Sequence, residues 1–499
     1  HNQSKVLTMA IWDNIFKQRK RTKRSYAAAK PHRLFNDFKA TSSSADSSIR
    51  FNLRALRDKS RDQARNNDYA KRYLQLLVTN VIGQNGIRLQ SKARDPNNQL
   101  DMVGNNLIER EWKKWCKKGN CTVDGRLSFL DCQKLFMESL ARDGEVLIRY
   151  FNTGNSKDPF RIQFLDADYL DEEKNQSLNN DSEIIMGVQI DKFGKPELYW
   201  IFSEHPHDTY FKTRTRQHQK VDAEEILHAY MPDRAEQTRG VPFMSTALNR
   251  LKMLDGYEEA ELVAARVGAS KMGFFTSPAG DGYSGDDLED QYTPVMNAEA
   301  GTFEQLPDGM GFQTFDPQHP TSGFDAFHKA VLRGIASGLG VSYVSLANNL
   351  EGVNYSSIRQ GTLEERDNYR ILQQFMIEHF LEPIFQRWLF QSMSFKSNFP
   401  LPLDKYEKFA DAAIFVPRSW GWIDPVKEVK ANVDGLQAGV VTMQDIQANY
   451  GRDVEELYEQ HQREEQLADK YGVQTAYQPF GAMKMPVDPE VTGEDDESQ

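Results

Sequence analysis

Two aspartates follow an expected strand with the spacing of a possible metal site. Asp166 and Asp168 flank Ala167 directly after the expected strand 161–165. Alternating carboxylates can bind Mg²⁺, and such a site would support an enzyme that acts on nucleic acid. A turn after a strand also often carries Asp, because its side chain hydrogen-bonds to the backbone. We favour the structural interpretation, and the magnesium interpretation stays open as its alternative.

The ten histidines are scattered along the chain. His205 and His207 flank Pro206 in an expected loop, without acids at a suitable spacing for a metal. His379 lies among apolar residues of an expected helix, which is typical of a packed or interfacial side chain. The histidines therefore do not indicate a metal site.

The three cysteines, Cys116, Cys121 and Cys132, are close in sequence. A tetrahedral zinc site would need a fourth ligand, and the chain has no further cysteine and no histidine nearby. The common phosphate-binding, hydrolase-elbow and zinc-protease motifs are also missing from the sequence. We expect no catalytic residue, no metal and no cofactor, so any movement of DNA would need another protein to hydrolyse ATP.

The composition is that of a large polar protein with real cores. The chain has 499 residues, 39% of them hydrophobic, and seven tryptophans, with a mean hydropathy of −0.66. That length ordinarily predicts two to four domains. We expect no membrane span and no secretory signal, and hence a protein made in a reducing cytoplasm. Residues 1–8 precede Met9, the expected natural start, and we leave them out of the functional argument.

Charge is unevenly distributed along the chain. The net charge of −11 argues against a general nucleic-acid binder. Residues 1–40 nevertheless carry ten Lys or Arg and only two acids, whereas residues 486–499 carry six acids and no base. Both ends are typical of solvated, disordered tails. The basic arm could also contact nucleic acid or acidic partner surfaces.

The first half of the chain predicts an α+β module. Apolar spacing changes from a period near four to a period of two at about residue 145. Ser128 is an expected N-cap with Asp131 in the first turn, and residues 191–194 form an expected hairpin turn. The expected helices are 50–80, 105–118 and 127–142, and the expected strands are 145–151, 161–165, 184–190, 198–202 and 226–230.

Two helices then flank an insertion. Residues 243–269 predict a helix, residues 272–323 are rich in Gly, Pro and acids, and residues 324–339 predict a second helix. Like charges crowd the first helix and form either a solvated acidic face or a wall that does not bind passing DNA. Small residues near its end permit close helix approach. The acids are Asp255, Glu258, Glu259 and Glu261, and the small residues include Ala260, Ala264 and Gly268.

A polar segment leads into a long helix over residues 357–388. Ser357 and Gln360 have the spacing of a capping box, and the helix is expected to kink or end at Glu382–Pro383. Leu372, Phe375 and Phe380 share its apolar face. Further helices are expected at 426–437, with Pro425 in the first turn, after Thr442, and from residue 453 to about 470.

This order of segments resembles the lambda-type portal proteins of tailed bacteriophages. The sequence Gly-Val-Asn-Tyr-Ser-Ser-Ile-Arg at residues 352–359 is similar to a signature of that family. Further similar pieces follow the family's order, and they span roughly residues 50–460. They lie at residues 65–70, 85–88, 115–116, 123–126, 143–146, 237–242, 260–264, 422–428 and 451–453.

The resemblance implies a portal fold of α+β class with a wing, a stem helix pair, a β-rich clip insertion, a long tunnel helix and a helical crown. The implied divisions are a basic flexible arm (1–49), the wing (50–245), stem helix 1 (246–271), the clip (272–323), stem helix 2 (324–340), a tunnel loop (341–356), the long helix (357–395), a return to the wing (396–424), crown helices (425–475) and an acidic disordered tail (476–499).

The resemblance also implies a function without catalysis. Copies of the chain would form a ring, usually a dodecamer, that conducts double-stranded DNA at one capsid vertex of the virion, with assembly in the host cytoplasm. Expected partners are the terminase large subunit, head-completion or neck proteins, and the major capsid protein or a scaffold. The alternatives are a magnesium-dependent nucleic-acid-processing enzyme and another phage structural or adaptor protein.

Site residues follow from these roles. The tunnel loop would present polar side chains to DNA, the stem would line the channel, and the clip would dock the terminase. The residues are Asn348, Asn349, Glu351 and Asn354 for the loop; Asp255, Glu258 and Glu259 for the channel; Ala260, Ala264, Gly268, Leu372, Phe375 and Phe380 for the subunit interface; and Tyr283, Asp286, Asp287 and Tyr292 for the clip.

Overall fold

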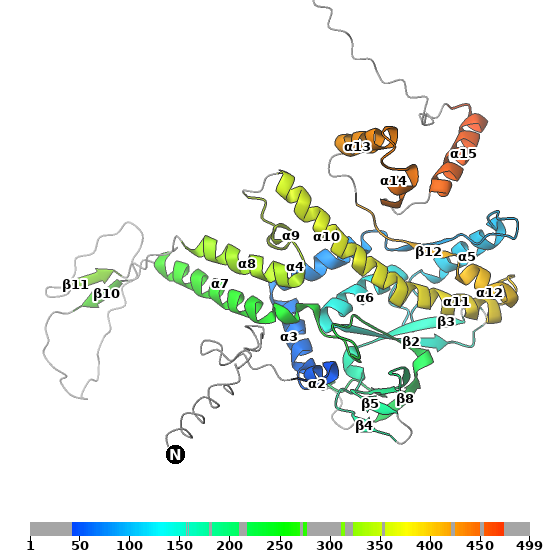
Figure 1. Ribbon diagram of the computed structural model, residues 1–499. Coiled ribbons are helices and arrows are strands. Elements are labelled where there is room, and N and C mark those ends of the chain that lie inside the picture. The colour runs from blue at the N-terminus through cyan, green and yellow to red at the C-terminus, as the bar shows by residue number, and fades with distance from the viewer. Residues whose placement is uncertain are drawn as a thin grey trace, which may run out of the picture.

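The computed structural model combines helices with two main sheets (Figure 1). A body of helices and sheets carries a hairpin of two helices, α7 and α8, that points away from it, with the strand pair β10–β11 beyond the hairpin's far end. The mixed helix and sheet class expected from the sequence is confirmed. The structure describes residues 42–155, 157, 159–178, 182–208, 217–269, 273–276, 311–314, 323–351, 355–420, 425–449 and 454–473.

The helix expected over residues 50–80 is divided in two at Asn67. This residue is extended, with φ −115° and ψ 127°, and its side chain accepts hydrogen bonds from the backbone N–H groups of Tyr69 and Ala70. An Asn in that role begins a new helix. The helices of this region are α2 (Ala45–Arg50), α3 (Leu53–Asn66), α4 (Asp68–Leu77), a π-helical turn (Val78–Ile82), α5 (Met102–Trp115) and α6 (Phe129–Asp143).

A three-stranded antiparallel sheet has the order β3-β2-β9, and a five-stranded one has the order β4-β5-β6-β7-β8. The strand expected at 184–190 is instead two strands, because Met186 and Gly187 have positive φ and turn the chain. Strand β8 was not expected. The strands are β2 (Glu145–Asn152), β3 (Phe160–Leu165), β4 (Gln176–Ser177), β5 (Glu183–Ile185), β6 (Val188–Ile190), β7 (Pro196–Phe202), β8 (His218–Asp222) and β9 (Ile226–Tyr230).

Two local predictions are confirmed by their hydrogen bonds. Ser128 and Asp131 cap each other's backbone at the start of α6. Asp191 accepts hydrogen bonds from the N–H groups of Phe193 and Lys195 in the turn between β6 and β7. Each prediction rests on side chains within four residues of the backbone groups that they bind.

The long helix begins earlier than expected and continues past its proline. It comprises α10 (Tyr355–Met376), a π-helical turn (Ile377–Leu381) and α11 (Glu382–Phe395). Ser357 therefore lies inside the helix and is not its cap. Glu382 donates its N–H to the carbonyl of Ile377, a wider bond than in an α-helix. This widened turn precedes Pro383, which lacks the N–H that an unbroken α-helix would use.

Aromatic side chains from α5, α6 and the long helix form the main core. Phe380 is fully buried and stacks on Phe136 with ring centroids 4.4 Å apart, and it also stacks on Phe129. Trp388 packs edge-on against Trp112 at 5.0 Å. The long helix thus belongs to the centre of the body, as Figure 1 shows for α10 and α11.

The last described segments return to the body and then form small helices. Strand β12 (Ala413–Val416) pairs antiparallel with β1 (Arg88–Ser91). The helices are α13 (Pro425–Gln437), α14 (Met443–Asn449) and α15 (Val454–Tyr471). Pro425 opens α13 as expected, and Thr442 and Asp445 cap each other's backbone. Within the described residues, no helix is both long enough and apolar enough to cross a membrane.

Candidate functional site

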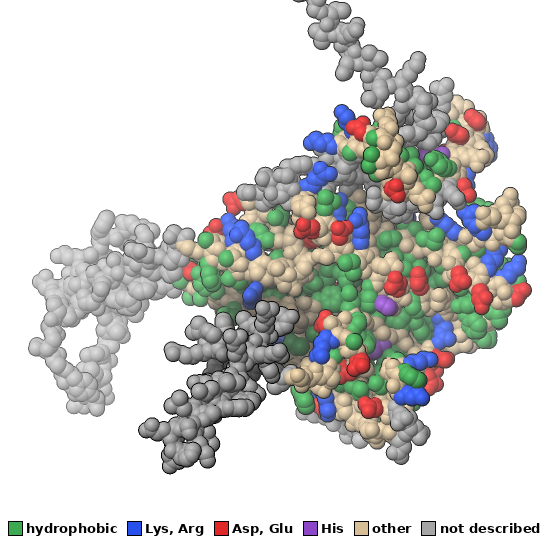
Figure 2. All heavy atoms as spheres, viewed as in Figure 1, with side chains coloured by type: hydrophobic (Ala, Val, Ile, Leu, Met, Phe, Trp, Pro, Cys, Tyr) green, Lys and Arg blue, Asp and Glu red, His purple; other side chains and the backbone are tan. Residues whose placement is uncertain are grey.

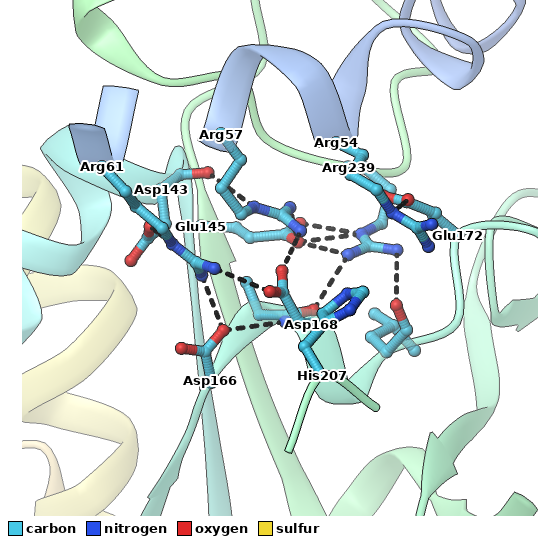
Figure 3. Close-up of polar contacts among 12 residues, drawn as sticks. Arg54, Arg57, Arg61, Asp143, Glu145, Asp166, Asp168, Glu172, His207 and Arg239 are labelled. Atoms are coloured by element: carbon cyan, nitrogen blue, oxygen red, sulfur yellow. Dashed lines mark hydrogen bonds and ion pairs between the residues drawn. The ribbon is translucent and has the colours of Figure 1, made fainter. Parts of the chain in front are cut away.

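Arginines, not open space, face the two aspartates that raised the magnesium hypothesis. Arg61 on α3 binds three carboxylates at 2.6 Å each, through Nε to Asp143, Nη1 to Asp168 and Nη2 to Asp166 (Figure 3). Asp166 also accepts the N–H of Asp168 at 3.0 Å, the turn bond that the structural interpretation predicts. The carboxylates are therefore held by protein groups.

Behind this layer lies a fully buried glutamate. Glu145, the first residue of β2, accepts hydrogen bonds from Arg57 at 2.8 Å, from Arg239 Nε at 2.9 Å and from His228 at 3.0 Å (Figure 3 shows the two arginines). Burial alone would raise the pKa of Glu145, but the charge and hydrogen bonds of Arg239 and the hydrogen bond of His228 hold it well below its ordinary value. Burial lowers the pKa of His228, so a neutral imidazole donates to a carboxylate.

The charged residues around Glu145 and Arg61 have a structural role. They join α3, the end of α6, β2, β9 and the segment around Arg239. Asp166, Asp168 and His205 lie close enough together to share an ion. A cation there would meet the guanidinium of Arg61, 2.6 Å from both carboxylates, and its positive charge opposes binding. The magnesium hypothesis thus loses the free carboxylates on which it depends.

Helices α7 (Leu248–Ala269) and α8 (Phe324–Leu339) pack side by side as a hairpin. Leu251 and Leu254 are buried toward the body, and Tyr257 stacks on Phe324 with ring centroids 5.6 Å apart. The hairpin therefore has its own apolar seam. It projects beyond the sheets, so much of its surface is not covered by the body in one copy (Figure 1 and Figure 2).

Three of the four acids of α7 were expected to line the channel, and these three do not share one environment. Glu258 is half-buried, pairs with His328 and accepts a hydrogen bond from the hydroxyl of Tyr69 at 3.1 Å. Burial and then Glu258 raise the pKa of Tyr69, which keeps it a donor. Asp255 pairs with Lys252 at 3.1 Å, and Glu259 is exposed. Glu258 thus ties α7 to α4 and α8, leaving Asp255 and Glu259 as the outward acids.

The expected tunnel loop begins with a short helix, α9 (Tyr343–Ala347). Asn348 ends it in the left-handed conformation, with φ +51°, which Asn tolerates better than most residues. Asn349 donates to the hydroxyl of Tyr343 at 3.3 Å and accepts the N–H of Glu351 at 2.8 Å. Glu351 is exposed and lies 3.7 Å from Lys329 on α8. Asn354 lies outside the described residues.

A buried carboxylate on α10 holds the start of α9. Glu365 accepts hydrogen bonds from the hydroxyls of Ser345 at 2.8 Å, Ser342 at 3.1 Å and Tyr369 at 2.7 Å. Arg72 on α4 donates to the carbonyl of Ser345 at 3.2 Å. These bonds set the position of α9 between the hairpin and the long helix, and hence the origin of the loop that follows.

The expected interface residues divide by burial. Ala260 is exposed and Ala264 half-exposed on α7, while Leu372 and Phe375 are half-buried against the core. Phe380 is wrong as an interface residue, because it is fully enclosed within a single chain. Gly268 lies in the last turn of α7, and its surroundings are not described. The clip residues Tyr283, Asp286, Asp287 and Tyr292 lie outside the described residues, between β10 (Gly273–Thr276) and β11 (Gly311–Thr314).

Sequence reasoning missed the charged core. Arg57 and Arg61 lie one turn apart on α3, next to the buried Leu53, and Glu145 directly precedes the buried apolar residues 146–148 of β2. A charged residue in such a strand is a signal of a buried ion pair. Its partner Arg239 is 94 residues away in sequence, and no local pattern connects the two. Glu365 likewise reads as one more polar residue of α10.

Comparison with known proteins gives consistent matches. A family model described as phage portal protein, lambda family, matches residues 32–373. A probable portal protein of Halomonas phage phiHAP-1 is 35% identical over 462 residues, covering 91% of this chain and 88% of that one. Portal protein B of Escherichia phage lambda is 24% identical over 470 residues, covering 85% of each chain. A chain in the solved neck of a native GTA particle has 13% identity and a TM-score of 0.41, covering 79% of this chain and 91% of that one.

Proposed function

Because this chain belongs to the lambda family of phage portal proteins, we propose that its copies form a ring whose channel conducts double-stranded DNA at one vertex of the capsid. The family match over residues 32–373 carries this proposal, since it spans both main sheets, the hairpin and most of α10. The ring serves genome packaging, head–tail joining and DNA ejection. The number of subunits we expect is twelve.

The described elements fit the parts of such a machine. The α3–α6 helices and the two sheets form the wing, and the α7–α8 hairpin forms the stem. Strands β10 and β11 begin and end the clip, residues 343–351 belong to the tunnel loop, and α10–α11 is the long helix. Helices α13–α15 form the crown. The hairpin and the loop after α9 are the elements nearest the DNA.

The remaining roles belong to partners. The terminase large subunit docks on the clip and supplies the ATP hydrolysis, head-completion or neck proteins replace it after packaging, and the major capsid protein or a scaffold surrounds the wing. Assembly takes place in the host cytoplasm and the product is part of the virion. The chain itself performs no catalysis, which accords with the occupation of Asp166 and Asp168 by Arg61.

Electron microscopy of the purified full-length chain, together with mass measurement by light scattering, tests the proposal. We expect closed rings with a central hole wide enough for a DNA duplex. A population that stays monomeric at all concentrations and salt conditions, or that hydrolyses nucleic acid with Mg²⁺, would contradict it. The second outcome would restore the enzyme alternative, which no described contact favours.

A further inference from the structure

An apolar groove runs between α7 and α8 on one side of the hairpin. Its volume is about 650 Å³, and its rim carries Met253 and Phe327, whose side chains are 75% and 54% exposed. Tyr257 lies between them, with its ring 5.2 Å from that of Phe327. Large apolar side chains left in water beside a concave apolar surface mark a place where another protein surface packs.

One end of the groove carries the guanidinium group of Arg250. Arg250 lies over Gly334, so close that a Cβ added to the glycine would lie 2.6 Å from its Nη1 atom. The guanidinium forms no hydrogen bond or ion pair with any residue that the structure describes. The groove is thus apolar along its length and open to a carboxylate at the end nearer the body.

The opposite side of α7 carries complementary groups. Nine residues make two and a half turns of an α-helix, so Glu259 is opposite Arg250 and Leu262 is opposite Met253. Leu262 and its neighbour Val263 are 71% and 55% exposed. Glu259 is exposed and pairs with no described cation. The pairs Arg250–Glu259 and Met253–Leu262 are each nine residues apart. One placement of a second copy therefore brings both pairs together.

We propose that the groove of one copy receives Leu262 and Val263 of the next copy, with Glu259 of that copy facing Arg250. The proposal rests on the ring of the proposed function and adds the surfaces that build it. A ring requires a head-to-tail contact, in which each copy offers two different and complementary faces. The groove and the Leu262 face lie on opposite sides of one helix, which is the arrangement that such a contact needs.

The nine-residue offset also determines the inclination of the hairpin. Nine residues span roughly 13 Å along a helix axis. Copies in a ring are related by rotation about its axis, so each residue has the same height along that axis in every copy. Contact between residue 253 of one copy and residue 262 of the next therefore requires these two residues to have equal heights within one chain. That is possible only if α7 is inclined to the ring axis. Helices parallel to the axis would instead bring equal residue numbers to the same height.

Disulfide trapping tests the contact directly. Within one chain, residues 253 and 262 are on opposite sides of α7 and roughly 13 Å apart along it, beyond the reach of a disulfide. Met253→Cys with Leu262→Cys, treated with diamide, should form bonds only between copies, as two thiols are oxidised and diamide is reduced. Denaturing gels should then show a ladder of covalent oligomers. The single variants and a Met253→Cys, Phe193→Cys pair measure the background from the three native cysteines.

Charge reversal provides the second measurement. Arg250→Glu or Glu259→Arg alone should weaken ring assembly at least about tenfold, and the double reversal should restore it. Rings without a 253–262 ladder and without restoration would overturn the contact while leaving the proposed function intact. Absence of rings from the unmodified chain would instead overturn both. A ladder together with restoration establishes the groove as the subunit interface.

Discussion

At the scale of single residues, buried charges hold distant segments of the wing together. Glu145 is enclosed by Arg57, Arg239 and His228, which come from a helix, a loop and a strand. A buried ion pair of this kind contributes little over an apolar packing, but its disruption leaves a charge without compensation. The cluster therefore makes the assembly of these segments all-or-none.

Removing the charge of Glu145 tests this view. Glu145→Gln should lower the free energy of unfolding by about 3–5 kcal/mol, because the buried Arg239 loses its carboxylate partner and Arg57 keeps only Asp168. Thermal unfolding measures it, with the exposed Glu183→Gln on β5 as the control. An effect as small as that of the control would show that Glu145 is not the centre of the cluster.

The same residues predict an acid-sensitive wing. The pKa values of His228 and Glu145 are both lowered in the folded chain, so the unfolded chain binds more protons as pH falls. The stability that these two groups contribute is fully present above pH 6.5, the ordinary pKa of histidine. It should fall first below that pH, and again below the ordinary glutamate pKa of 4.5. Unfolding midpoints across pH 4–8 check this, and Glu145→Gln should flatten the lower step.

At the scale of elements, α9 connects the hairpin to the long helix. It lies between two left-handed residues, Gly340 with φ +68° and Asn348 with φ +51°, and Glu365 holds its first turn. The helix therefore behaves as a rigid segment whose position depends on one carboxylate. The position of α9 in turn determines where the loop after it begins.

Glu365→Ala should release α9 from α10. Three hydroxyls would lose their acceptor, and we expect a loss of about 1–3 kcal/mol in stability together with faster hydrogen exchange of residues 342–347. Glu364→Ala, one position away and exposed, is the matched control. Unchanged exchange at residues 342–347 would mean that Arg72 and the packing of α9 suffice to hold it.

The loop after α9 is expected to face DNA without gripping it. Asn349→Arg with Glu351→Arg adds a phosphate-binding charge that is repeated around the ring. We expect normal rings but slower translocation, or impaired retention and release of packaged DNA. In vitro packaging with this double variant measures the effect. Glu183→Arg on β5 with Phe193→Arg on the β6–β7 turn adds the same charge at exposed positions elsewhere and is the control. Packaging at the normal rate and to full length would place the loop away from DNA.

At the scale of the whole molecule, the single chain leaves the hairpin surface uncovered. Ala264→Trp on α7 should block the close packing of neighbouring hairpins and lower the mass of the assembled species. Light scattering on the variant decides this, with Lys192→Trp on the β6–β7 turn as the control. Rings of unchanged mass would refute the placement of Ala264 in the interface.

Local chemistry in the sequence determined many of the elements and, through ordered motifs, the family. The start of α6 and the turn at Asp191 follow from side chains within a few residues of the backbone that they bind. Helix α8 ends at Gly340, whose left-handed conformation suits glycine. Helical and strand periodicity likewise determined most element types, because one face of each element must be apolar.

Only the tertiary structure decided which side chains meet. Phe380 has the pattern of an interface residue yet lies in the core, because α6 and β3 both pack on the same turn of the long helix. Glu258 looks like part of an acidic wall yet pairs with Tyr69, 189 residues away. A helical pattern says that one face is covered but not what covers it. The covering surface comes from parts of the chain that have no periodic relation to it.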